Sequence, residues 1–218
     1  MADPVFVNGT GKLVQNNPLL PTITLSVTAG DDVFLSFESA SGDIEPTSVT
    51  DGAGNTFTEL TSFVSSGGNT IIVYRSHITV TQAGDVITLH MDGTGENIII
   101  CVVQYSGVTS IGAIAKAEKS ASKSFTLAEA IGASSIYLMA AAAWGNFGTI
   151  SVTTGNLRAS GDSLSPTGNP VSGGLGDNST GTMTWADTVI ENWDGIGIEL
   201  VGGVASIFIN QGGEDAIG

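Results

Sequence analysis

The feature that most constrains the fold of this chain is a strict alternation of apolar and polar residues over short segments. Between residues 22 and 28, Ile23, Leu25 and Val27 alternate with threonine and serine. This is the period of a β-strand that buries one face. Residues 29–32 (AGDD) then give a turn signal, after which the alternation resumes. Because this unit recurs along the chain, the sequence predicts an all-β protein.

Two longer apolar segments predict strands in the interior. Residues 98–103 (IIICVV) are apolar in both parities and β-branched, which is typical of a central strand covered on both faces. We expect Cys101, within this segment, to be a buried and unreactive thiol. Residues 136–144 (IYLMAAAAW) are rich in alanine, which suits a strand where two layers approach closely, with a short helix as the alternative. Both segments are too short to span a bilayer, so no membrane is expected.

Composition favours a single domain of antiparallel sheets. The chain has 218 residues with 30 glycines, and 41% of it is hydrophobic, which suffices for one core. We predict a jelly-roll-like antiparallel β-sandwich over residues 21–210, with about ten strands. The later strands are expected around residues 149–153, 181–186, 195–201 and 204–210.

Three regions depart from the strand pattern. Residues 1–20 have apolar positions without a period, and prolines at 18 and 21 argue against a helix, so we predict an extended N-terminal arm. Residues 161–181 are rich in Gly, Ser, Pro and Asn, which predicts a long loop. Residues 211–218 are predicted to form a polar C-terminal tail.

The charge of the chain excludes one class of partner. Its formal net charge is −15, with six basic residues, so a phosphate backbone would be repelled and nucleic-acid binding is not expected. Three lysines cluster in residues 115–123 (AKAEKSASK). We interpret this cluster as a solvated segment, with a contact to an acidic partner as the alternative. The first residues lack an apolar leader, which predicts folding in the cytosol.

The stretch SVTDGAGNTFT, residues 48–58, poses the choice between a calcium loop and a tight turn. Asp51, Asn55 and the following Glu59 offer side-chain oxygens, but Ala53 has none where a calcium ligand is wanted. Glycine and asparagine tolerate the positive φ of tight turns, so we predict a hairpin turn. The stretch DGTGEN, residues 92–97, is interpreted in the same way. No metal and no cofactor are predicted.

The chain lacks a catalytic motif. A catalytic triad needs a histidine, and the two in the sequence, His77 and His90, are expected on the polar faces of strands. No G-x-S-x-G, H-E-x-x-H or phosphate loop occurs. The paired carboxylates are scattered through predicted turns and the tail: Asp31 with Asp32, Glu191 with Asp194, and Glu214 with Asp215. The sequence therefore predicts a protein that is not an enzyme.

Aromatic side chains are the usual sugar-binding platforms of β-sandwiches. Trp144, Trp185 and Trp193 are the candidates in this chain. Trp185 shares its parity with Met183, which favours the core. Trp193 stands among polar residues in ENWDGIG, so it is predicted to be the best exposed platform.

Four segments in this order carry a family resemblance: SVTDGAGNTFT, VYRSHITVTQAGDVITLHM, VVQYSGV and ENWDGIGIELVGG. Over residues 22–205 the chain resembles a β-sandwich module of tailed-phage virion proteins, which also occurs in some bacterial extracellular proteins. The resemblance implies the sandwich fold, and the family has no shared catalytic residues.

The resemblance also implies a role in a virion. A capsid decoration (cement) protein assembled in the host cytoplasm would bind the major capsid protein, with a homotrimer as the expected state. The residues predicted to make subunit contacts lie in the arm: Val5, Phe6, Leu13, Val14, Leu19 and Leu20. The alternatives are a phage tail or receptor-binding adhesin, and a carbohydrate-binding module.

Overall fold

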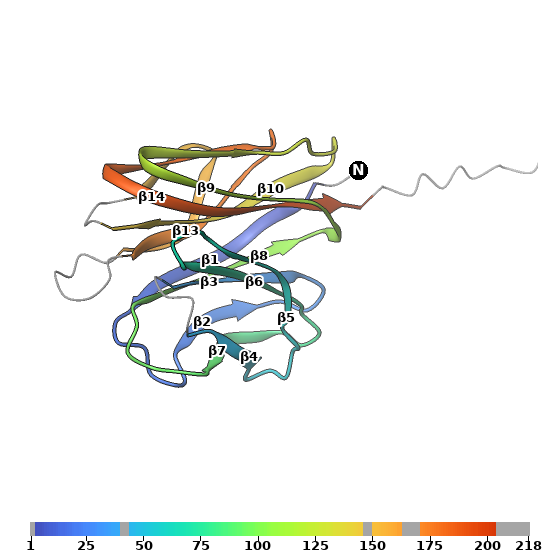
Figure 1. Ribbon diagram of the computed structural model, residues 1–218. Coiled ribbons are helices and arrows are strands. Elements are labelled where there is room, and N and C mark those ends of the chain that lie inside the picture. Colours follow the sequence, from blue (N-terminus) through green and yellow to red (C-terminus); the bar gives the residue numbers. More distant parts are fainter. Residues whose placement is uncertain (1–2, 40–43, 146–149, 163–170, 204–218) are drawn as a thin grey trace, which may run out of the picture.

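Antiparallel β-sheet makes up the regular structure of this protein. The computed structural model describes residues 3–39, 44–145, 150–162 and 171–203. Within these ranges the chain forms fourteen strands and no helix, which confirms the all-β prediction (Figure 1). In particular, no helix of the described residues is long and apolar enough to cross a membrane.

A middle sheet forms the centre of the molecule. Its strands, in spatial order, are β1 (Val5–Val14), β8 (Ile98–Ser106), β3 (Asp32–Ser39), β6 (Thr70–His77) and β5 (Thr58–Val64). Alternate residues of β3 face opposite layers, so that Leu35 packs in the core below the sheet and Phe34 in the core above it. Strand β8 is buried on both faces, as predicted from residues 98–103, and Cys101 is buried within it.

A lower sheet of three strands covers one face of the middle sheet. Its order is β2 (Thr22–Val27), β7 (Gln82–Met91) and β4 (Pro46–Asp51). The alternating residues identified in the sequence, such as Ile23 and Leu25, point into the core between these two sheets. Strand β1 pairs with β8, and β2 pairs with β7. This nested pairing is compatible with a jelly-roll-like order, which stays a prediction.

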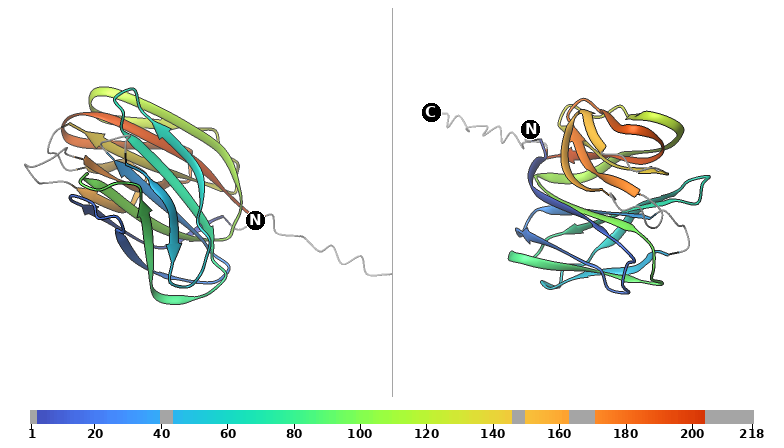
Figure 2. Two further views of the ribbon diagram at one scale, coloured as in Figure 1. Left: turned by 60° about the horizontal axis from the view of Figure 1, so that its bottom comes forward. Right: turned by 90° about the vertical axis from the view of Figure 1, so that its left-hand side faces the viewer.

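An upper sheet covers the other face of the middle sheet (Figures 1 and 2). Its main order is β11 (Ile150–Thr154), β14 (Thr182–Gly202), β10 (Ser135–Trp144), β13 (Val171–Asn178) and β12 (Asn156–Asp162), and β9 (Val108–Ala128) pairs with the other side of β14. Residues 136–144 lie in strand β10, as predicted, and do not form the short helix that was the alternative. The alanines of β10 alternate between the cores on its two faces.

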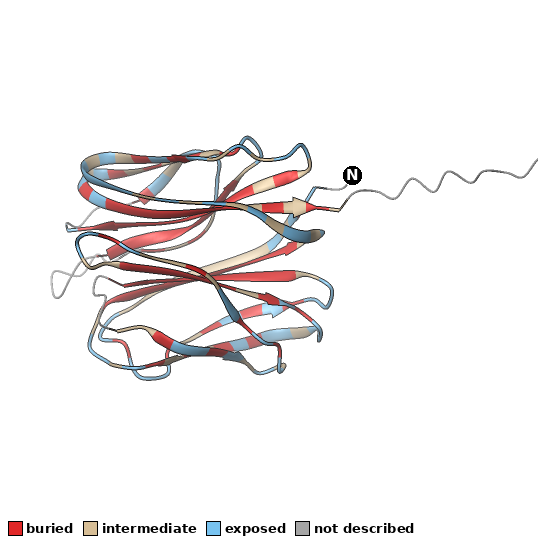
Figure 3. Cartoon of the chain, turned by 45° about the vertical axis from the view of Figure 1, so that its right-hand side comes forward, coloured by how far each residue is buried: buried red, intermediate tan, exposed pale blue. Residues whose placement is uncertain are grey.

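The β9–β14 ribbon bends and covers the outer face of its own sheet. The second half of β14 pairs with β10, whereas its first half pairs with β11. Phe125 and Trp185 from the bent part bury Tyr137 and Met139 of β10 in a third core cluster. The two strands predicted at residues 181–186 and 195–201 are therefore one continuous strand. Buried residues run through all of these layers in Figure 3.

The N-terminal region is not a separate arm. Strand β1 pairs along its length with β8, from Val5 opposite Ser106 to Val14 opposite Ile98. Its apolar period is obscured because both of its faces meet other layers and its glycines meet the backbone of β12. A Cβ atom on Gly11 would lie 2.6 Å from the Ser160 carbonyl oxygen. The segment thus belongs to the middle sheet.

The predicted loop at residues 161–181 is also corrected. Strand β13 lies within it and is buried over Val171–Asp177. Its glycines permit close packing, since a Cβ atom on Gly174 would lie 2.3 Å from the Ala159 carbonyl oxygen. Residues 163–170, the strand predicted at 204–210 and the polar tail at 211–218 lie outside the described residues.

Candidate functional site

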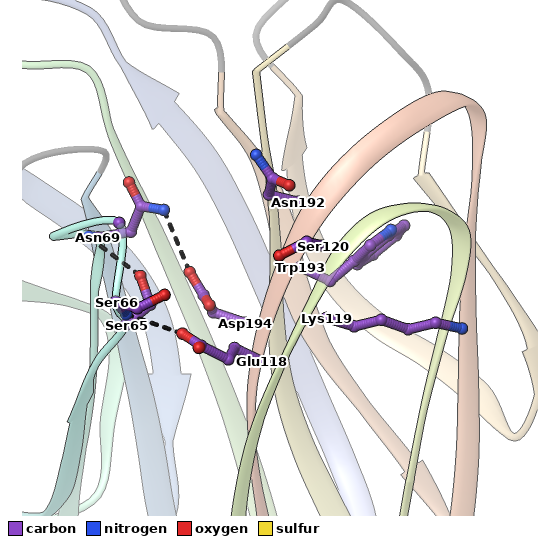
Figure 4. Close-up of a pocket in the computed structure, with 10 residues that line it drawn as sticks. Ser65, Ser66, Asn69, Glu118, Lys119, Ser120, Asn192, Trp193 and Asp194 are labelled. Atoms are coloured by element: carbon purple, nitrogen blue, oxygen red, sulfur yellow. Dashed lines mark hydrogen bonds between the residues drawn. The ribbon is translucent and has the colours of Figure 1, made fainter.

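A polar pocket opens between the middle and upper sheets at the turn that joins β5 to β6. Its empty space is about 360 Å³, including the part open to solvent. Residues 65–67 and Asn69 line one side, and residues 118–120 of β9 and 192–194 of β14 line the other. Figure 4 shows carboxylate, amide and hydroxyl groups gathered around this space. The arrangement suits a small ligand that offers several hydrogen bonds.

Strand pairing places the two carboxylates of the pocket side by side. Glu118 lies opposite Asp194 in the β9–β14 ladder. The Asn69 side-chain nitrogen donates to Asp194 Oδ2 at 3.3 Å, and the Ser66 backbone N–H donates to Glu118 Oε2 at 2.8 Å (Figure 4). Each carboxylate of the upper sheet thereby holds the β5–β6 turn of the middle sheet.

The two carboxylates differ in environment. Asp194 is 3% exposed, and burial raises its pKa to about 6, although hydrogen bonds from Asn69 and Ser65 lower it in part. Glu118 is exposed. A carboxyl group that changes charge near neutral pH beside a second carboxylate is a common feature of functional sites. The pocket is therefore the strongest candidate site among the described residues.

Replacement of Asp194 by asparagine is expected to remove part of the pH dependence of stability. The pKa of about 6 in the folded protein exceeds the ordinary aspartate value of 3.8. The folded state therefore loses stability as the pH rises between these two values, by about 3 kcal/mol at most. In urea unfolding from pH 4 to pH 7, the free energy of unfolding of Asp194→Asn should increase relative to that of the wild type up to about pH 6 and then stay at a constant difference.

The control for this prediction is Glu118→Gln, which changes the exposed carboxylate of the same pocket. It should reduce the slope of unfolding free energy against pH only slightly, because the charge of Glu118 is the smallest of the causes that raise the pKa of Asp194. Parallel wild-type and Asp194→Asn curves would show that burial does not perturb this group.

The stretch around Asp51 forms a turn closed by its own side chains. Asp51 accepts hydrogen bonds from the backbone and side-chain nitrogens of Asn55, both at 2.7 Å. Asn55 Oδ1 in turn accepts from the Thr79 backbone N–H at 2.8 Å. The prediction of a turn is confirmed: an isolated antiparallel bridge joins Thr50 to Thr56 across it, although β4 and β5 belong to different sheets. Glu59 is exposed on β5.

A second carboxyl group, that of Asp85, faces Asp51. Burial and the neighbouring Asp51 raise the pKa of Asp85, and its Oδ1 accepts the Gly52 backbone N–H at 3.0 Å. In the second predicted turn, residues 92–97, Asp92 accepts the Glu45 backbone N–H. Within the described ranges no group of three or more His, Cys, Asp or Glu residues is placed to hold a metal ion.

Of the histidines and carboxylates singled out in the sequence, His77 and Asp32 come together, but His90 lies apart from them. His77 lies 3.6 Å from buried Asp32, which also binds Arg75 at 2.8 Å, whereas His90 contacts Thr50 in the lower sheet. Glu191, which the sequence paired with Asp194, is buried in the bend of β14. The carboxylate that lies opposite Asp194 is that of Glu118. Glu214 and Asp215 lie outside the described residues.

The prediction of an exposed tryptophan platform is wrong. Trp193 is 1% exposed, stacks on Phe125 and donates its indole N–H to the Ser122 carbonyl oxygen. Its polar sequence neighbours alternate onto the other face of β14, which opens to the pocket. Trp185 is in the core, as predicted, and Trp144 is also buried.

The six residues predicted to make subunit contacts have separate environments. Phe6 and Leu13 pack against the core between the middle and upper sheets, and Val14 packs against the lower core. Val5, Leu19 and Leu20 are more than half exposed. The structure therefore leaves three of the six available to a neighbour.

The pocket residues were not predicted as a group, because they come from segments far apart in the chain. Asn69 follows β5, Glu118 lies in the lysine cluster, and Asp194 lies in the second half of β14. Comparison of the chain with protein-family models, with curated proteins and with solved structures gave no match.

Proposed function

We propose that the protein is a non-enzymatic structural protein of a virion, a capsid decoration (cement) protein that binds a shell of major capsid protein and stabilises it. The proposal rests on the resemblance to phage β-sandwich modules and on one structural observation. That observation is the chemistry of the two outer faces of the stacked sheets.

The outward side chains of the lower sheet carry no Asp, Glu, Lys or Arg. They alternate with the buried residues of β2, β4 and β7: Thr22, Thr24, Ser26, Ser48, Thr50, Val86, Thr88 and His90. Thr88 lies between Thr22 and Thr50 in the strand ladders, so the hydroxyls form a continuous row. On a chain of net charge −15, this is a broad surface without formal charge.

The opposite face of the molecule carries a smaller hydroxyl-rich patch, near Lys119, whose Nζ donates to the Ser124 carbonyl oxygen. Where the β9–β14 ribbon bends over the upper sheet, Thr126 and Thr184 are hydrogen-bonded neighbours, and Ser151 and Thr153 of β11 lie beside them. Charged residues are depleted from the centres of protein interfaces, because their desolvation is costly. An uncharged face on one side of the stacked sheets and a hydroxyl-rich patch on the other suit a protein that joins neighbouring subunits.

The test is to purify particles from the source of this sequence and to measure the copy number of the chain per particle by quantitative mass spectrometry. A cement protein is present in hundreds of copies. Thr24→Glu together with Thr50→Glu should reduce attachment while the melting temperature stays unchanged, and Thr94→Glu in an exposed loop is the control. Absence of the chain from particles would refute the proposal.

The second candidate is an adhesin or carbohydrate-binding module, which the polar pocket favours. Its carboxylates, amides and hydroxyls could bind sugar hydroxyls, although the buried Trp193 provides no stacking surface. A few copies per particle, with glycan binding that Asn69→Ala abolishes, would support this candidate over the cement protein.

A further inference from the structure

We propose that residues 204–210 (VASIFIN) of one copy of this chain add as a strand to the free edge of β9 in a second copy. The inference does not depend on the proposed function. It rests on an unpaired edge, on the point where the described chain leaves the sheet, and on the charges of the two segments.

The outer edge of β9 is the longest unpaired edge among the described strands. Its 21 residues form a ladder with β14 on one side only. Strands β2, β4 and β11 offer edges of six residues or fewer. A long unpaired edge presents backbone donors and acceptors to which another chain can pair.

The neighbouring edge, that of β5, is protected by side chains of β9. Lys116 Nζ donates to the Ser62 carbonyl oxygen at 2.6 Å, and Glu118 accepts from the Ser66 N–H. Strand β1 is approached closely by β12. Within β9, Lys119 Nζ and Ser122 Oγ donate to the Ser124 carbonyl oxygen. No described side chain donates to a carbonyl oxygen of residues 108–118, so this stretch of β9 is the edge open to a further strand.

The segment that follows β14 has the composition of a strand. Ile207, Phe208 and Ile209 are β-branched or aromatic residues of high strand propensity. Strand β14 ends at Gly202, opposite Val108 at the start of β9. The described chain therefore leaves the sheet at the end of this ribbon, beside the strand that has the free edge.

The segment cannot reach the free edge of β9 in its own chain. A strand on that edge lies two strand spacings from β14, about 9.5 Å. Gly203 alone joins β14 to the segment, so the two steps from Gly202 to Val204 span at most about 7 Å. A second copy has no such restriction, because its segment approaches the edge from outside. The second copy is therefore the partner that fits.

Charge favours the same partner. Lys116, Lys119 and Lys123 are half of the six basic residues and all lie on β9. The segment is followed by Glu214 and Asp215. Two chains of net charge −15 repel each other over most of their surfaces, so this edge is where an acidic segment can approach.

The test uses the full chain and light scattering over a range of concentrations. The wild type should self-associate, and Ile207→Asp should raise the dissociation constant by at least about tenfold, because it places a charge in the added strand. Thr94→Asp, with the same charge change in an exposed loop, is the control. A peptide of residues 204–218 should compete with self-association.

A charge exchange makes the test specific. Lys119→Glu with Lys123→Glu should weaken association, and addition of Glu214→Lys with Asp215→Lys should restore it. A wild type that stays monomeric, or an Ile207→Asp variant that associates as tightly as the wild type, overturns the inference. Peptide binding to a chain that stays monomeric also overturns it, because the segment would then not join two copies.

Discussion

Gly174→Ala is expected to lower the free energy of unfolding by about 3 kcal/mol or more, the upper range for overpacking a core. A Cβ atom at this position would lie 2.3 Å from the Ala159 carbonyl oxygen and 3.1 Å from the Ser160 Cα. These atoms are backbone, so a side-chain rotation cannot relieve the contact. Strand β12 cannot retreat either, because a Cβ atom on Gly11 of β1 would already lie 2.6 Å from the Ser160 carbonyl oxygen.

Gly67→Ala is the matched control for this substitution. The nearest atom to its added methyl group would be the Asn69 side-chain nitrogen at 3.5 Å, an ordinary van der Waals distance. Thermal and urea unfolding of both variants should show a large loss for Gly174→Ala and a small change for Gly67→Ala. Equal stabilities would mean that β12 and β13 are not packed as closely as the structure shows.

These glycines also explain where the sequence was a poor guide to the fold. Alternation identified β2 and β3, and an apolar run identified β8. These patterns depend only on whether each face of the strand meets water or the core, so they can be recognised within one segment of sequence. In β13, glycine is required by the close approach of another strand. Locally it has the composition of a loop, so residues 161–181 were interpreted as one.

The same reasoning applies to β1 and to the pocket. Strand β1 has no clear period because β8 pairs with it and β12 approaches its glycines, and both strands are distant in sequence. The pocket needs Asn69, Glu118 and Asp194 together, and only the register of β9 with β14 and the position of the β5–β6 turn make them neighbours. A single sequence contains no local signal for such pairings.

Glu38→Gln is expected to remove a loss of stability that grows with pH. Glu38 is fully buried on β3, and burial raises its pKa well above the ordinary value, a shift that its hydrogen bond from Ser36 only partly opposes. Its Oε2 has no hydrogen-bond partner among the described residues and would lie 1.8 Å from a Cβ atom on Gly173. The Glu38 side chain thus fills the space beside Gly173, where no described cation or second donor offsets the cost of ionising its carboxyl group.

The sign of the effect follows from the direction of this shift. Because the pKa of Glu38 is higher in the folded than in the unfolded chain, its contribution to stability is complete below the unfolded value and is lost as the pH rises toward the folded value. Over that window the wild type should lose up to about 1.4 kcal/mol per pH unit relative to Glu38→Gln, which stays neutral.

Urea unfolding at pH 4, 6 and 8 measures this difference. Glu59→Gln, at an exposed glutamate on β5 of the same sheet, is the control and should follow the wild type at every pH. A difference between wild type and Glu38→Gln that is constant from pH 4 to pH 8 would contradict the prediction. It would mean that a cation or a buried donor compensates the Glu38 carboxylate, so that the group is ionised inside the folded protein.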